Sequence, residues 1–164
     1  MLYPLNISLS TEGARQLEGE IGRMVARIRD LSPVWPEAYE MWRGHERTLF
    51  ATQGRSAGLL WPGLSARYAA WKARFFPGKT LLRRSDRLYA SLTAPYHSDQ
   101  VYRPGLRSLE VGTQVPYAAH LESGKGRWWQ RPRERPVVVM SKAALQELAG
   151  QVHAYLWAQR ASGA

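Results

Sequence analysis

The tetrapeptide Pro77-Gly78-Lys79-Thr80 is the first stretch whose residue types suggest chemistry, because it matches the end of a phosphate-binding P-loop. The complete pattern also requires a glycine five residues before Gly78, and Ala73 stands there. A P-loop follows a buried strand, whereas the residues before this turn have the spacing of a helix. We therefore exclude a P-loop.

The side chains that ligate metals or act as bases are few and scattered. The four histidines are His45, His97, His120 and His153, and none has the spacing of a metal-ligand pair. Cysteine is absent, which excludes a thiol nucleophile, a disulfide and a thiolate metal site. We expect no catalytic residue, no cofactor and no metal. For His120 we expect a structural role, in hydrogen bonds to the backbone of its own turn.

Positive charge is the stronger signal. The 164 residues carry 23 Lys and Arg against 13 Asp and Glu, a formal net charge of +10. A surplus of this size favours a polyanionic partner or an acidic neighbouring protein. Arginine outnumbers lysine by 19 to 4, a bias that suits bidentate contacts but that a GC-rich genome also produces.

The first basic cluster lies in the stretch LLRRSDRLYASL, residues 81–92. Arg83, Arg84 and Arg87 fall at the predicted start of a short helix that directs Leu88 and Leu92 inward. Cations at a helix N-terminus are slightly unfavourable, which suggests a partner. Two readings fit: the arginines contact a neighbouring subunit or DNA phosphate, or they form a solvated face in which Asp86 pairs locally.

The second basic cluster lies in the connection 125–135. It surrounds Trp128 and Trp129 with Arg127, Arg131 and Arg133. Cations and aromatic rings together are typical of a platform for single-stranded nucleic acid, and equally of an arm that docks on a neighbouring subunit. In a third reading the tryptophans pack on their own domain. We favour docking, because no nucleic-acid-reading motif is recognisable.

Hydrophobic periodicity predicts the helices that position these clusters. A stripe of apolar residues recurs at helical spacing after a cap at Ser10 or Thr11, and Pro33 and Pro36 end that helix. The predicted helices cover residues 11–30, about 36–51, about 85–93 and one turn within 116–124. A short helix capped by Ser65 carries Tyr68 and Trp71, and a last helix capped by Ser141 has Leu145, Leu148, Val152 and Tyr155 on one face. We expect Trp61, Tyr68 and Trp71 to be core.

Two segments have the pattern of strands. Residues 101–113 read as a hairpin around a Pro104-Gly105 turn, and residues 137–140 as a short buried strand. The predicted class is therefore α+β, a small mostly antiparallel sheet flanked by helices. We expect an N-terminal arm (1–10) that is either frayed or added to a neighbour's sheet, followed by one domain (11–164) with a helical part (11–60) and a core (61–160). No apolar run approaches the ~20 residues of a membrane helix, so we expect a soluble cytoplasmic protein without a membrane partner.

Three segments, in this order, resemble the phage virion-morphogenesis family, the tail-completion and neck proteins typified by protein G of phage Mu. WPGLSARYAAWK (61–72), LLRRSDRLYASL (81–92) and VGTQVPYAAHLESG (111–124) are similar to the family's three motifs. RPR (131–133) stands where the family has a proline and an arginine before its last strand and helix. The residues that coincide with the family's motifs include Trp61, Tyr68, Lys72, Leu88, Ser91, Gly112, Tyr117, His120, Glu122 and Gly124.

The resemblance implies a structural virion protein with a tail-terminator-like domain. Such proteins form a ring, commonly six-fold, that completes the tail or joins it to the head. The implied partners are copies of the chain itself, the tail tube or terminator, the head-completion or portal proteins, and genomic DNA passing through the lumen. The implied location is the virion neck or tail, after assembly in the host cytoplasm. From the residues alone, a stand-alone nucleic-acid-binding protein is the alternative.

The sequence departs from the family at two places. Asp86 replaces the usual glycine of the second motif, and we expect it to cap the following helix instead. Glu134 and Arg135 stand where the family has an aromatic residue, while Trp128 and Trp129 come earlier. The anchoring of this loop is therefore expected to differ.

Overall fold

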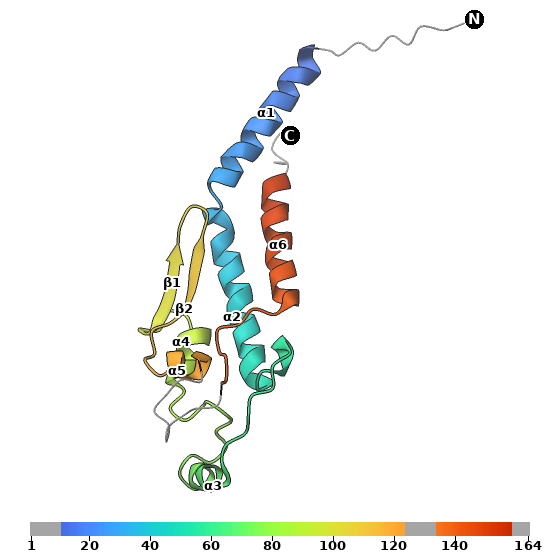
Figure 1. Cartoon of the computed structure of the whole chain (residues 1–164). Coiled ribbons are helices and arrows are strands. Elements are labelled where there is room, and N and C mark those ends of the chain that lie inside the picture. Colours follow the sequence, from blue (N-terminus) through green and yellow to red (C-terminus); the bar gives the residue numbers. More distant parts are fainter. Residues whose placement is uncertain (1–10, 124–133, 159–164) are drawn as a thin grey trace, which may run out of the picture.

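The computed structural model describes residues 11–123 and 134–158 (Figure 1). Within them the helices are α1 (Thr11–Arg29), α2 (Trp35–Ala51), α3 (Ala66–Phe75), α4 (Arg87–Thr93), α5 (Ala118–Ser123) and α6 (Lys142–Trp157). Short 3-10 turns, η1 (Ser32–Val34) and η2 (Arg55–Ala57), flank α2. The strands β1 (Gln100–Pro104) and β2 (Leu109–Thr113) form one antiparallel hairpin. The α+β class is confirmed.

The helix boundaries follow from capping and proline. Pro33 lies within the η1 turn that separates α1 from α2, and Pro36 lies in the first turn of α2, where its missing N–H costs nothing. Ser65 and Ser141 cap α3 and α6, because their hydroxyls accept hydrogen bonds from backbone N–H groups of the first turn. These predicted starts agree with the structure to within one residue.

Helix α2 lies at the centre, with the hairpin on one side and α6 on the other (Figure 1). Its inner face buries Trp42, Leu49 and Phe50. The same core continues into α4 through Leu88 and Leu92. A smaller cluster of Val34, Trp35 and Ala38 packs on the inner side chains of α6, namely Leu148, Val152 and Tyr155.

The hairpin is tied to the first half of α2. It pairs Gln100 with Thr113 through Pro104 with Leu109, and Tyr102 packs on Tyr39 of α2 at 4.5 Å between ring centroids. At its far end Trp35 Nε1 donates to the Gly105 carbonyl at 2.6 Å. Residues of the predicted helical part (11–60) and of the predicted core (61–160) therefore pack in the same hydrophobic core.

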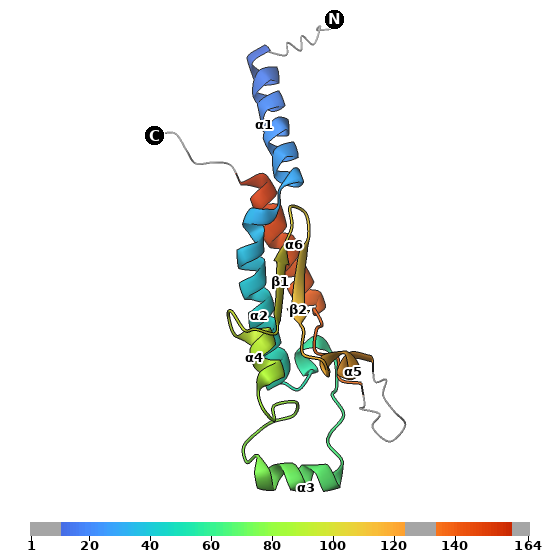
Figure 2. The same cartoon turned by 90° about the vertical axis from the view of Figure 1, so that its left-hand side faces the viewer.

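The molecule is elongated, with α1 projecting at one end and α3 at the other (Figure 2). No residue of α1 is buried, and its apolar stripe is exposed. The prediction that Tyr68 and Trp71 belong to the core is wrong: both are exposed, because α3 stands away from the body instead of packing on it. Trp61 is buried, as expected.

The predicted strand over 137–140 is wrong. Val137 is fully buried, but residues 134–140 have no strand partner within the described chain and run as an extended connection. Their backbone groups are satisfied by side chains instead, as described below. The predicted arm (1–10) lies outside the described residues.

Candidate interaction surfaces

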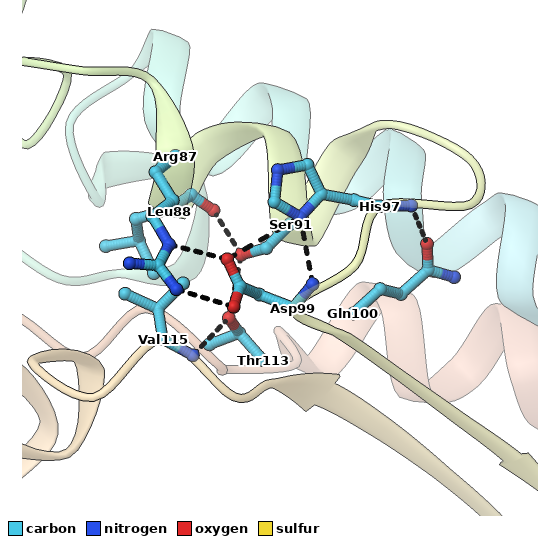
Figure 3. Close-up of polar contacts among 8 residues, drawn as sticks. All are labelled: Arg87, Leu88, Ser91, His97, Asp99, Gln100, Thr113 and Val115. Carbon is cyan, nitrogen blue, oxygen red and sulfur yellow. Dashed lines mark hydrogen bonds and ion pairs between the residues drawn. The ribbon is translucent and has the colours of Figure 1, made fainter.

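The second and third motif segments meet where α4 packs against the hairpin (Figure 3). Ser91 on α4 is completely buried, and its hydroxyl donates to the Leu88 carbonyl at 2.8 Å. The same oxygen lies 2.7 Å from the Thr113 hydroxyl on β2, and that hydroxyl accepts from the Val115 N–H at 3.1 Å. Ser91 therefore joins a helix to the end of a strand, and its role is structural.

The predicted basic cluster on α4 does not act as one unit. Arg87 makes two hydrogen bonds to the Asp99 carboxylate, at 2.6 and 2.7 Å (Figure 3), and this bond holds the pKa of Asp99 below its usual range. Arg83 donates to Asp86 at 2.8 Å and lies 3.9 Å above the Tyr89 ring. Arg84 is exposed and has no salt bridge within the described part of the chain. For Arg83 and Arg87 the structure favours local pairing.

Asp86 stands at the N-cap of α4, but its side chain makes no capping hydrogen bond. Its carboxylate accepts from Arg83 and Lys79 instead, and these two bonds lower its pKa. The expected capping role is wrong. The backbone of Asp86 has a φ of 58°, the left-handed region in which glycine is favoured and Asp is among the tolerated residues. A glycine at this position would adopt the same conformation without strain.

The third motif ends in α5, where Glu122 binds the extended connection. One Glu122 oxygen accepts from the backbone N–H groups of Val137 and Val138, at 2.6 and 2.7 Å. Gly112 is buried on β2, and Tyr117 and His120 are exposed. Gly124 lies outside the described residues. Glu122 is the member of this motif with a clear structural role.

Residues 134–140 are held by side chains from three directions. Arg135 is buried and donates to the Pro62 carbonyl at 2.7 and 2.9 Å. Trp61 Nε1 donates to the Pro136 carbonyl at 3.0 Å. His45 Nε2 lies 3.0 Å from the Val139 carbonyl. The first and third motif segments are thus joined through this connection, and Arg135 is a structural arginine.

Glu46 on α2 lies under this connection and was not singled out from the sequence. It is 0% exposed, and neither carboxylate oxygen has a hydrogen-bond partner of normal geometry among the described residues. Burial raises the pKa of Glu46 to about 9, the Glu122 charge adds to this effect, and the Val139 N–H opposes it. Glu46 is therefore uncharged at neutral pH. In the sequence, the only sign of this buried acid is that Glu46 lies on the face of the helix that also carries the large aromatic residues.

Helix α3 presents an exposed row of aromatic rings. Tyr68 is 38% exposed, Trp71 39% and Phe75 56%. Tyr68 stacks on Trp71 with 5.3 Å between centroids, Trp71 contacts Phe75 at 5.6 Å, and Arg74 lies over Phe75. Contiguous exposed apolar surface of this kind marks an interaction site.

Beside the aromatic row, α3 is held by a buried lysine. The Lys72 ammonium donates to the Thr80 carbonyl at 2.5 Å, and burial lowers its pKa. This bond closes the turn after α3, where Gly78 has a φ of 75°. Lys72 therefore orients the aromatic row without being part of it.

The strongest predicted contact residues fall outside the described ranges. Arg127, Trp128, Trp129, Arg131 and Arg133 all lie between residues 124 and 133. The described residues contain no cluster of three or more potential metal ligands. No helix among them is long and apolar enough to cross a bilayer.

Comparison with protein-family models, with curated proteins and with solved structures finds no match for the chain.

Proposed function

We propose that this chain is a structural protein of a phage virion that completes the tail or joins it to the head. It acts through contacts with copies of itself, closing a ring through which DNA passes, and through contacts with tail-tube, terminator, head-completion or portal proteins. No bond is made or broken in this role. Its place is the neck or tail of the particle, after assembly in the host cytoplasm.

The exposed aromatic row on α3 is the observation that carries an assembly role. Aromatic residues beside arginine are enriched where proteins bind one another, and here they lie on a helix that projects from the body. Without a partner, the row exposes apolar surface to water. A partner that covered the row would bury that surface. A neighbouring copy in a ring is the partner we propose.

The resemblance to the virion-morphogenesis family supports the more specific role. Ser91, Glu122 and Trp61, which coincide with three separate motifs, join neighbouring parts of one fold. Asp86 has the left-handed backbone where the family has glycine. If the three motifs define one fold, residues from different motifs are expected to hold neighbouring parts of that fold together.

The test is a double substitution on α3, Trp71→Ala with Phe75→Ala, in the full chain. We expect the variant to keep its helical circular dichroism and to lose the ring, because both side chains are exposed and contribute little to the monomer. Native mass spectrometry and negative-stain electron microscopy over a range of protein concentrations measure the assembly. The matched control is Tyr96→Ala, which removes an aromatic ring that is 98% exposed and lies away from α3.

The alternative, a stand-alone nucleic-acid-binding protein, gives a different result. It would remain monomeric at every concentration and bind DNA with an affinity that falls steeply with salt, as the net charge of +10 allows. That outcome would contradict the proposed ring.

A further inference from the structure

Helix α1 carries an aliphatic stripe that the rest of the described chain does not cover. Leu17, Ile21, Val25 and Ile28 are between 42% and 57% exposed. They recur at the spacing of one helix face, and α1 projects beyond the body in both views (Figures 1 and 2). An aliphatic stripe with charges along its edges is the pattern of a helix that pairs with another helix.

The last turn of α1 is anchored to the body. Arg27 donates to the Leu156 carbonyl at 3.0 Å, and the Tyr155 hydroxyl donates to the Asp30 carbonyl at 3.0 Å, just after the helix. These contacts fix the direction of α1, while the earlier turns of the helix have no residue that the described part of the chain buries. Isolated helices of this length are marginal in water, so a partner along the stripe would stabilise α1.

The charges of α1 identify the partner's orientation. Its acids, Glu12, Glu18 and Glu20, all lie in the first half, and three of its four arginines, Arg23, Arg27 and Arg29, lie in the second. A parallel neighbour with this sequence would set like charges against like. An antiparallel copy places acids beside arginines at both ends.

The charged residues along the edges of the stripe also favour the antiparallel orientation. Glu20 and Arg27 are seven residues apart and therefore lie on the same edge. In an antiparallel pair, each edge of one helix faces the same edge of its partner, so Glu20 of each copy faces Arg27 of the other. Helix α1 has a formal charge of only +1, from four arginines and three glutamates, whereas the chain carries +10, so repulsion does not oppose contact here.

We propose that α1 binds the α1 helix of a second copy in antiparallel orientation, making a two-fold dimer. This inference goes beyond the proposed ring, because a two-fold contact buries the same surface on both copies, whereas a ring contact joins two different surfaces. The aromatic row on α3 lies at the opposite end of the molecule and remains free in such a dimer (Figure 2). Two helices of this length bury less than the about 1,200 Å² of a standard interface, so we expect a weak, reversible dimer.

Charge reversal tests the complementarity. The variant Glu18→Arg with Glu20→Arg places arginine against arginine, and we expect at least a tenfold weaker dimer by sedimentation equilibrium of the full chain. The matched control, Glu12→Arg with Glu147→Arg, has the same net charge but changes one exposed residue beyond the paired stretch and one on α6. An unchanged dissociation constant in the first variant, or an equal loss in both, would overturn the proposal.

Disulfide trapping tests the orientation, since the natural chain has no cysteine. In the antiparallel register Leu17 of one copy meets Ile28 of the other, while two copies of either residue lie about 16 Å apart along the axis, too far for a disulfide. Mixing Leu17→Cys protein with Ile28→Cys protein under mild oxidation should give mainly the mixed disulfide. Dimers of like variants would indicate parallel pairing, and a statistical or absent product would indicate no α1 contact; each overturns the proposal.

These tests separate the dimer from the ring. Trp71→Ala with Phe75→Ala should abolish the ring and leave the mixed disulfide unchanged. Loss of both in that variant, with the fold intact, would mean that α3 rather than α1 forms the two-fold contact.

Discussion

Helices α1 and α2 follow one another in the chain and have similar lengths, 19 and 17 residues, yet they have opposite roles. Helix α2 buries eight of its residues between the hairpin, α4 and α6, whereas α1 buries none. Both have apolar residues at helical spacing. The difference teaches that periodicity reveals the apolar face of a helix but not the molecule that covers it.

Side-chain type explains which helix occupies the interior. The buried face of α2 carries large aromatic rings, which fill the space between a sheet and two helices. The α1 stripe carries aliphatic side chains only and has glutamate and arginine along its edges. An aliphatic stripe with charged edges suits a helix–helix seam exposed to solvent, so we interpret α1 as an interface element and α2 as the core.

The largest expected effect is the difference between α2 and α1 in how far a truncated side chain lowers the free energy of unfolding. Leu49→Ala in α2 removes a side chain with 0% exposure and should lower the free energy of unfolding by about 3 kcal/mol. Ile21→Ala in α1 removes a half-exposed side chain and replaces it with a better helix former, so the monomer should change by less than about 0.5 kcal/mol. Urea unfolding below the dimer's dissociation constant measures both. Equal losses would contradict the contrast between the helices.

The sequence predicted most of the fold because local signals set it. The serine caps at Ser65 and Ser141, the Pro33 and Pro36 break and the Pro104-Gly105 turn each act within a few residues of the chain. What failed depended on distant partners. The buried Val137 reads as a strand, but its backbone binds Glu122 across the fold.

The candidate surfaces were harder to predict for the same reason. Tyr68 and Trp71 have the spacing of core residues, and only the packing of the whole chain shows that α3 leaves the body. The cluster of Arg83, Arg84 and Arg87 is dense in sequence, but Asp86 and Asp99 neutralise two of the three. Charge counted along the chain cannot show that Asp99, twelve residues away, is the partner of Arg87.

A second prediction compares a buried glutamate of α2 with an exposed glutamate of α1. Glu46 of α2 is uncharged when folded because burial raises its pKa to about 9, whereas in the unfolded chain its pKa is near 4.5. Between these values the unfolded state releases a proton that the folded state keeps, so the contribution of Glu46 to stability is greatest below about pH 4.5 and falls as pH rises. The loss from this residue is at most about 1.4 kcal/mol per pH unit.

Replacing Glu46 with glutamine should remove that slope. We expect Glu46→Gln to be more stable than the natural chain at pH 8, with the advantage shrinking toward pH 5, measured by urea unfolding at several pH values. The control is Glu18→Gln on α1, whose side chain is exposed, and which should leave the pH dependence of the monomer unchanged. A Glu46→Gln profile parallel to that of the natural chain would mean that Glu46 is ionised in the fold.

The smallest expected effect uses two glycines in equivalent surroundings. Gly22 lies inside α1 and Gly44 inside α2, and a Cβ atom added at either position meets no other atom within 4 Å. Alanine favours the helix over glycine by about 0.5–1 kcal/mol, so each substitution stabilises its own helix. Because α2 unfolds with the core, Gly44→Ala should raise the free energy of global unfolding by that amount.

Gly22→Ala should act differently, because no residue of α1 is buried by the described part of the chain and the helix can unfold on its own. We expect unchanged global unfolding, a small gain in helical circular dichroism, and slower amide hydrogen exchange confined to residues 12–26. If both variants raised global stability equally, α1 would be part of the cooperative core even without a partner. Slower exchange in α1 only at concentrations that favour the dimer would instead locate its stability in the contact with a second copy, which is where the exposed stripe and the segregated charges of α1 place it.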